Sequence, residues 1–200
     1  AGKIVYELLA DGVLEEVETP EAAEASLRGR PGRMLRLNQT ASRLLALQLG
    51  LRETTVAGLP LGVSGEDEWD VAFSVDPTGA NPSGEWEKQL RAAAKKIGGG
   101  GIRGALLSVP GILDEATNRV LFSPNIHWTE KADLAAIVRK IWNVPVLLVQ
   151  EERALAMGHH LLNPGCDDFL LVDFGEGVGG AIIVDGKPLA NPLPISGEIG

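Results

Sequence analysis

The feature that most constrains this chain is a cluster of glycines between two apolar segments near its C-terminal end. Four glycines within 175–180 separate an apolar run at 169–172 from a second one at 181–184, and an Asp-Gly pair follows directly. Glycine supplies the backbone angles that tight turns need, and Asp-Gly favours a two-residue hairpin turn. We therefore predict a hairpin at each of these two turns.

The same glycines are also candidates for binding a phosphate. Exposed backbone N–H groups in a glycine-rich turn can cradle an anion, which makes Gly175, Gly177 and Gly179 a candidate phosphate-type loop. The stretch is not a Walker loop, because no Gly-Lys-Ser/Thr follows, and no helix opens after it as a dinucleotide fingerprint requires. The spacing alone leaves open whether the glycines bind a ligand or only permit the turn.

The whole stretch from 167 to 200 resembles the ROK family of repressors, open reading frames and sugar kinases. The shared order is an apolar strand, an Asp-x-Gly-x-Gly-x-Gly turn at 173–179, a second strand with an Asp-Gly turn, and Gly-Glu-Ile-Gly at 197–200. The resemblance implies an α/β, actin/hexokinase-like fold, of which this chain holds the first lobe and the start of the second. It also implies that Glu198 binds sugar hydroxyls.

The totals agree with a globular α/β chain. The 200 residues are 44% hydrophobic and carry a formal net charge of -9, so any DNA contact must come from a local basic patch. No run approaches the length of a membrane span, and the N-terminus lacks the blocks of a signal peptide. The single Cys166 excludes an internal disulfide and suits a reducing compartment, so we expect a cytoplasmic protein without a membrane contact.

The first 40 residues combine a helix pattern with a basic segment. Residues 3–12 place apolar side chains on one helical face before a glycine stop, and a short strand follows. Arginines crowd the segment before a second strand at 34–37. ROK repressors carry a winged helix-turn-helix with this order, and the resemblance implies that residues 1–40 are its C-terminal part. The candidate DNA-binding residues are Lys3, Arg28, Arg30 and Arg33.

The tetrapeptide Arg28-Gly29-Arg30-Pro31 also resembles the core of an AT-hook, in which arginines lie in a narrow minor groove. The alternative is a solvated basic turn. Base edges are read by the first residues of a recognition helix, and this chain opens after them. We therefore expect poor operator discrimination by this fragment alone.

A strand-rich segment follows from Arg43, where alternation predicts a hairpin. In ROK kinases this hairpin carries an Asp-x-Gly-Gly-Thr loop that contacts ATP phosphates, and its aligned positions here are 48–52. Gln48, Leu49, Gly50, Leu51 and Arg52 lack the carboxylate, the second glycine and the threonine. This departure argues against ATP binding.

The middle of the chain predicts parallel strands covered by helices. We expect helices at 86–97 and 131–142 and buried strands at 102–109 and 146–149, an alternation typical of parallel sheets. Between them lies a Ser-Pro-Asn segment whose asparagine faces the sugar cleft in ROK proteins. Asn125 is thus a candidate hydroxyl-binding residue, although asparagine after proline is also a common turn former.

The residues after the last of these strands bear on catalysis. ROK sugar kinases have Glu-Asn-Asp here, and the family Asp is the general base that accepts the proton of the sugar hydroxyl. Glu151 falls on that position, preceded by Gln150 in place of Asn. The extra methylene displaces the carboxylate, and positioning dominates phosphoryl transfer, so we expect no kinase activity. Both remain candidate ligand-binding residues; alternatively, Glu151 and Glu152 are a charged helix start.

No metal site is predicted within the chain. His159 and His160 are adjacent and cannot face the same way on a helix, and Cys166 is isolated. ROK members often bind zinc through a His directly after Gly-Glu-Ile-Gly and a Cys-rich loop beyond it. A zinc site would therefore involve residues past Gly200, and no cofactor is expected within this chain.

These observations predict three segments and a regulatory function. We expect a partial winged helix-turn-helix at 1–40, the N-terminal ROK lobe at 41–163, and the start of the second lobe at 164–200. The favoured hypothesis is a transcriptional repressor with a catalytically inactive sugar-sensing domain. Its expected partners are operator DNA, a sugar or sugar-phosphate effector, and a second copy of itself. Two alternatives stay open: a sugar kinase with an unusual base, and a dimerisation platform that binds no sugar.

Overall fold

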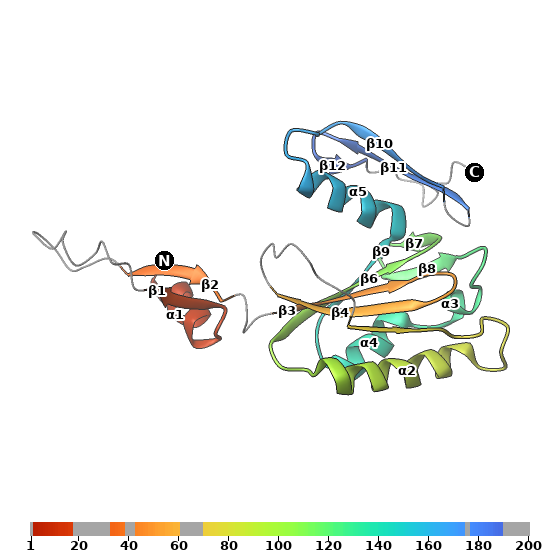
Figure 1. The fold of residues 1–200 in the computed structure, drawn as a ribbon, viewed down its shortest axis with the longest axis horizontal. Helices are drawn as coiled ribbons and strands as arrows, with labels where there is room; N and C mark the ends of the chain where they lie inside the picture. The colour runs from red at the N-terminus through yellow and green to blue at the C-terminus, as the bar shows by residue number, and fades with distance from the viewer. Residues whose placement is uncertain (1, 18–32, 39–42, 61–69, 175–176, 190–200) are drawn as a thin grey trace, which may run out of the picture.

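The computed structural model describes residues 2–17, 33–38, 43–60, 70–174 and 177–189. They form three units that follow one another along the chain (Figure 1). The first is a helix with a two-stranded sheet, the second a five-stranded sheet with its helices, and the third a helix beside a three-stranded sheet. We call them the N-terminal unit, the central unit and the C-terminal unit. No described helix is long and apolar enough to cross a membrane.

The N-terminal unit confirms the helix, stop and strand predicted for the start of the chain. Gly12, with φ at 70°, ends the helix, and the two strands pair antiparallel with Glu15 opposite Arg36. None of the helix residues is buried. The elements are α1 (Gly2–Ala10), β1 (Leu14–Val17) and β2 (Met34–Leu37).

The central unit is a mixed sheet with strand order β5-β4-β3-β6-β9. β3 pairs antiparallel with β4, which confirms the predicted hairpin, and β3, β6 and β9 run parallel, which confirms the predicted parallel strands. A small antiparallel hairpin of β7 and β8 lies beside β9. The strands are β3 (Arg43–Leu49), β4 (Thr54–Pro60), β5 (Val71–Phe73), β6 (Ile102–Val109), β7 (Ile112–Asp114), β8 (Arg119–Phe122) and β9 (Val146–Gln150).

Two helices, α2 (Pro82–Ile97) and α4 (Leu134–Trp142), lie on the same side of this sheet (Figure 1). The helix predicted at 131–142 is confirmed over 134–142, but it begins three residues later than predicted, after a separate short helix α3 (Trp128–Lys131). The chain leaves the helical conformation at Ala132, and the Asp133 carboxylate accepts a hydrogen bond from the Ala136 N–H at 2.9 Å. Such a side-chain cap stabilises a new helix start.

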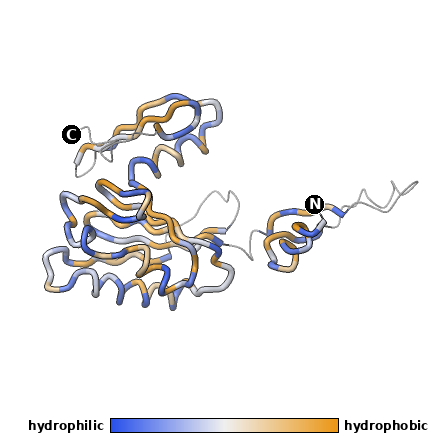
Figure 2. The backbone as a smooth tube through the Cα atoms, turned by 180° about the vertical axis from the view of Figure 1, so that it is seen from behind, coloured by the Kyte–Doolittle hydropathy of each residue, from blue (hydrophilic) through white to orange (hydrophobic). Residues whose placement is uncertain are grey.

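The main hydrophobic core lies between the central sheet and these helices. In β3 the buried residues alternate, so Leu45, Leu47 and Leu49 face the core. The period of two then places Gln48 on the opposite face of the sheet. Figure 2 shows the most hydrophobic stretches on the strands of this sheet. The other large side chains of this core that are fully buried are Val56, Trp86, Leu90, Leu107, Val109, Leu134 and Val138.

The C-terminal unit confirms both predicted hairpins. Its elements are α5 (Glu151–Leu162), β10 (Phe169–Phe174), β11 (Val178–Val184) and β12 (Lys187–Pro188). Asp185 and Gly186, with φ at 51° and 70°, form the predicted Asp-Gly turn. α5 packs its buried Ala156 against β11. The packing thus separates the chain between β9 and α5, whereas the boundary predicted from sequence falls at 163/164.

Candidate functional site

The three parallel strands β3, β6 and β9 end at the same edge of the central sheet. Gln48 pairs in register with Ser108, and Ser108 with Val149, so the last residues of all three strands are neighbours. In open α/β sheets ligands bind in the crevice outside the carboxyl ends of the strands. This edge is therefore where a ligand site is expected.

A hydrogen bond between Gln48 and Glu151 joins two of these strand ends. The Gln48 Nε2 donates to the Glu151 Oε1 at 2.8 Å, across 103 positions of sequence. Glu151 is the first residue of α5, and α5 rises from the sheet face opposite α2 and α4 (Figure 1). Gln150 precedes it at the end of β9 and is only 8% exposed. Glu151, at the position of the family base, is thus hydrogen-bonded to Gln48, at the position of the first residue of the phosphate loop.

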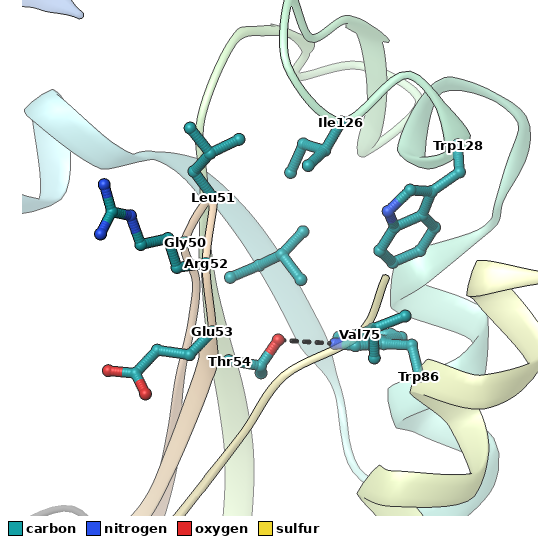
Figure 3. A pocket seen from close by; sticks show the side chains of 10 residues that line it. Gly50, Leu51, Arg52, Glu53, Thr54, Val75, Trp86, Ile126 and Trp128 are labelled. Carbon is teal, nitrogen blue, oxygen red and sulfur yellow. Dashed lines mark hydrogen bonds between the residues drawn. The ribbon is translucent and has the colours of Figure 1, made fainter. Parts of the chain in front are cut away.

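The turn between β3 and β4 closes on itself. The Gly50 N–H donates to the Glu53 carbonyl at 2.9 Å, so this N–H is already engaged. Beside the turn lies a hollow of about 250 Å³, part of it open solvent. Buried Trp86 closes one side of it and donates from its Nε1 to the Thr54 Oγ1 at 3.0 Å (Figure 3). The hollow is lined by Leu49, Gly50, Leu51, Arg52, Glu53, Thr54, Val75, Trp86, Ile126 and Trp128.

The segment that carries Asn125 is held by Glu130. The Glu130 Oε1 accepts from the Ser123 N–H at 3.0 Å and lies 2.8 Å from the His127 Nδ1. These hydrogen bonds, that of Ser123 first, lower the pKa of Glu130 below its ordinary value. Asn125 itself is exposed. Among the described residues it makes no hydrogen bond to Glu151, so its predicted role in ligand binding stays a prediction.

The glycine-rich turn of the C-terminal unit is shorter than the sequence suggested. Gly179 does not lie in the turn but in β11, where it pairs with Asp173. A side chain there would overlap the Glu152 carboxylate at the start of α5, so glycine permits the close approach of strand and helix. Gly177 lies just before β11. Gly175 and Glu198 lie outside the described residues, and their predicted ligand contacts stay predictions.

The arginines of the N-terminal unit that the structure describes are paired with carboxylates. Arg33 forms an ion pair with Glu16, and Arg36 with Glu15. Lys3 lies 3.9 Å from Glu7 on the same face of α1. Arg28 and Arg30 lie outside the described residues. The DNA contacts predicted for Lys3, Arg28, Arg30 and Arg33 stay predictions.

No group of three or more His, Cys, Asp or Glu side chains in the described part of the chain could hold a metal ion. The His160 Nδ1 instead donates a hydrogen bond to the Cys166 carbonyl at 3.0 Å and lies 3.7 Å from the Asp167 Oδ1. The zinc ligands that the ROK resemblance implies would lie past Gly200. The described residues do not fit a zinc site of their own.

The family is decided by a match over more than half of the chain. The ROK family model matches residues 90–200, which include β6, β9 and the Gln150-Glu151 junction. The chain belongs to the ROK family.

Two curated ROK relatives differ in their named functions. The xylose repressor of Caldicellulosiruptor bescii is 32% identical over 102 residues, which cover 50% of this chain and 25% of the repressor. A glucokinase of Halalkalibacterium halodurans is 26% identical over 155 residues, 74% of this chain and 46% of the enzyme. The chain thus spans less than half the length of these relatives.

Solved ROK structures show the same fold. One is a ROK family transcriptional regulator, a homolog of the E. coli MLC protein, which superposes with a TM-score of 0.70 at 24% identity. The superposition covers 100% of this chain and 50% of the regulator. The ROK glucokinase of Streptomyces griseus, solved with glucose and AMPPNP, gives 0.64 at 22% identity over 80% of this chain and 50% of its own. The actin/hexokinase-like α/β fold is therefore confirmed.

Sequence reasoning identified Gln48 as a departure from the kinase pattern but missed its contact with Glu151. One local signal was available, since the alternation Leu45, Leu47, Leu49 puts Gln48 on the face away from the core. The alignment of β3 with β9 through β6 was not available from local pattern. It is this alignment that brings the two side chains together.

Proposed function

We propose that this ROK chain is part of a sugar-responsive transcriptional repressor whose ROK domain senses a sugar without phosphorylating it. The observation that carries the proposal is the hydrogen bond of Gln48 to Glu151 at 2.8 Å. Glu151 lies at the position of the kinase general base, and Gln48 lies at the position of the carboxylate in the kinase phosphate loop. The hydrogen bond therefore occupies the Glu151 carboxylate with the Gln48 amide. A base that must accept the proton of an attacking hydroxyl needs that lone pair free and correctly placed.

The turn that would hold nucleotide phosphates also lacks the chemistry for it. Its Gly50 N–H is bonded to the Glu53 carbonyl, and a threonine hydroxyl and a second glycine are absent from 50–52. Phosphoryl transfer depends on electrostatic stabilisation of the phosphates and on metal ligands. The repressor relatives from Caldicellulosiruptor support the same assignment.

The N-terminal unit supports the DNA-binding part of the proposal. A helix followed by an antiparallel strand pair has the order of the second half of a winged helix-turn-helix. We propose that β1 and β2 are the base of the wing, that Arg28, Arg30, Arg33 and Lys3 contact DNA, and that the protein binds operator DNA as a homodimer in the cytoplasm. The ligand would act by favouring one of two arrangements of the DNA-binding head. The shift between these arrangements cannot exceed the difference in the ligand's affinity for them.

The experiment uses the full-length protein that contains this chain. A coupled ADP-release assay with ATP and a panel of hexoses, pentoses and N-acetyl hexosamines is expected to give no sugar-dependent turnover, with the Halalkalibacterium glucokinase as positive control. Calorimetric titration with the same sugars is expected to show binding of one of them, and a mobility-shift assay on DNA selected from random sequence is expected to show release by that sugar. Turnover would overturn the proposal, and absence of any sugar binding would favour the dimerisation platform.

A sugar kinase is the second candidate. The observation that favours it is the similarity to a glucokinase over 155 residues, a longer match than that to the xylose repressor. In that case Glu151 would serve as the base after releasing Gln48. Sugar-dependent ADP release that is abolished by Glu151→Gln would establish this candidate.

A further inference from the structure

The Gln48–Glu151 pair has a counterpart elsewhere in the molecule that clarifies what is special about it. On α2 the Gln89 Nε2 donates to the Glu85 Oε1, also at 2.8 Å and also partly buried. That pair spans four positions of one helix, where neighbouring turns bring such side chains together. The first pair spans 103 positions and joins β3 to the start of α5 at the ligand edge of the sheet. Its geometry therefore depends on the tertiary fold.

The hydrogen bond fixes which groups the pair offers to a ligand. With one N–H of its Nε2 committed to Glu151, the Gln48 amide keeps its Oε1, which accepts hydrogen bonds, and a second N–H, which donates them. The Glu151 carboxylate keeps its second oxygen, which is also an acceptor when ionised. The pair thus offers two acceptor oxygens and one N–H donor, and sugar hydroxyl groups, which both donate and accept hydrogen bonds, can satisfy all three.

The charges around the pair disfavour an anionic ligand. Glu151 and Glu152 both lie in the first turn of α5, where they already complement the positive end of the helix dipole. The cation on the same turn, Arg153, forms an ion pair with Glu115. On the neighbouring hairpin the oppositely charged side chains of Arg52 and Glu53 extend to the same side (Figure 3). A phosphate beside Glu151 would meet the like charge of that carboxylate, while the Arg153 guanidinium is already paired with Glu115.

We infer that Gln48 is a positioning residue for Glu151 and that the two together make the crevice select a neutral polyhydroxylated ligand over its phosphate ester. The inference rests on the proposed sugar-sensing function and sharpens it, because that function alone admits both ligand classes. Gln48 holds the carboxylate in one orientation, and Glu151 accepts from the ligand hydroxyl.

The test is calorimetry on the full-length protein with xylose, glucose, N-acetylglucosamine, and the phosphate esters of these sugars. The wild type is expected to bind one neutral sugar at least tenfold more tightly than its ester. Gln48→Ala is expected to weaken binding of that neutral sugar about tenfold, the loss that goes with one charge-assisted hydrogen bond. The matched control Gln89→Ala removes the same chemistry from α2 and is expected to leave the affinity unchanged.

A swapped pair separates positioning from mere structural support. Gln48→Glu alone sets two carboxylates against each other and is expected to abolish binding, whereas Gln48→Glu combined with Glu151→Gln restores the hydrogen bond with donor and acceptor exchanged. Recovery of part of the neutral-sugar affinity in the double variant, at an unchanged melting temperature, supports the inference. An unchanged affinity in Gln48→Ala, or tighter binding of the ester by the wild type, overturns it. Failure of the wild type to bind any sugar, neutral or phosphorylated, instead overturns the proposed function.

Discussion

The central unit and the N-terminal unit are held together by different forces. The central sheet buries a continuous core in which Trp86, Leu90 and Leu107 are each 0% exposed, and helices cover one of its faces. The N-terminal unit has no buried residue in α1, and the antiparallel pairing of its two strands is supplemented by the exposed ion pairs Arg33–Glu16 and Arg36–Glu15. Burial of apolar area stabilises a fold far more than exposed ion pairs do.

The difference shows where each unit keeps its functional groups. The core beneath its strands fixes Gln48 in the central unit, and the Gln48 hydrogen bond in turn holds Glu151 at the start of the C-terminal unit. The N-terminal unit instead keeps Arg33 and Arg36 at its surface, where each is paired with a glutamate. Four substitutions test this contrast.

Trp86→Ala should have the largest effect. Its ring is fully buried, packs 5.9 Å from the ring of Trp128, and donates to Thr54, so truncation leaves a cavity and an unpaired hydroxyl. We expect a loss of about 3–5 kcal/mol in the free energy of unfolding, measured by denaturant titration with far-UV circular dichroism. Trp86→Phe keeps most of the volume and should lose clearly less. Equal losses for the two variants would contradict a core held mainly by packing.

Asn118→Ala should come second. Asn118 adopts a left-handed backbone with φ at 57°, and its amide donates to the Val146 carbonyl at 3.0 Å and accepts from the Leu148 N–H at 2.8 Å. The side chain thus occupies the open edge of β9. We expect a loss of about 1–3 kcal/mol in the same titration. Asn118→Gly tolerates the backbone angle but lacks the amide, so a stability equal to the wild type would show that the edge contact is dispensable.

Glu130→Gln should have a pH-dependent effect. The hydrogen bond from Ser123, followed by that of His127, lowers the pKa of Glu130 from its ordinary 4.5 in the folded state. A lowered folded pKa contributes stability that is present above 4.5 and is lost as the pH falls through the folded value. The melting temperature of the wild type should exceed that of Glu130→Gln at neutral pH. This difference in melting temperature should disappear as the pH falls below 4.5 and through the folded-state pKa of Glu130. A gap that is constant with pH would exclude this role of the carboxylate.

Arg36→Ala should have the smallest effect on stability. Its ion pair with Glu15 joins two partly to largely exposed side chains, and such pairs contribute about 0–1 kcal/mol. A double-mutant cycle with Glu15→Ala at low and high salt measures the coupling, which should shrink with salt. A coupling as large as the Asn118 effect would mean that the N-terminal unit is held by its ion pairs more firmly than exposure suggests.

Much of the fold was predictable because its signals are local. The leucine alternation in β3, the helix pattern before Gly98 and the Asp185-Gly186 turn each depend on neighbours within a few residues. The break before α4 was missed because apolar spacing continues across Ala132, and only the Asp133 cap divides it. Gly179 was assigned to a turn because it follows two other closely spaced glycines. In the structure it lies in β11, where a side chain would overlap the Glu152 carboxylate, and the spacing of the glycines does not distinguish these two roles.

The residues of the candidate site could be predicted from the sequence, but the contacts between them could not. The residues themselves establish the family and the order of the elements, since motifs and apolar patterns are read directly from the chain. The bond between Gln48 and Glu151 and the packing of α5 on β11 required the assembled fold. Each joins segments distant in sequence, and such contacts form only when the strands between them are aligned and a common core has fixed their register.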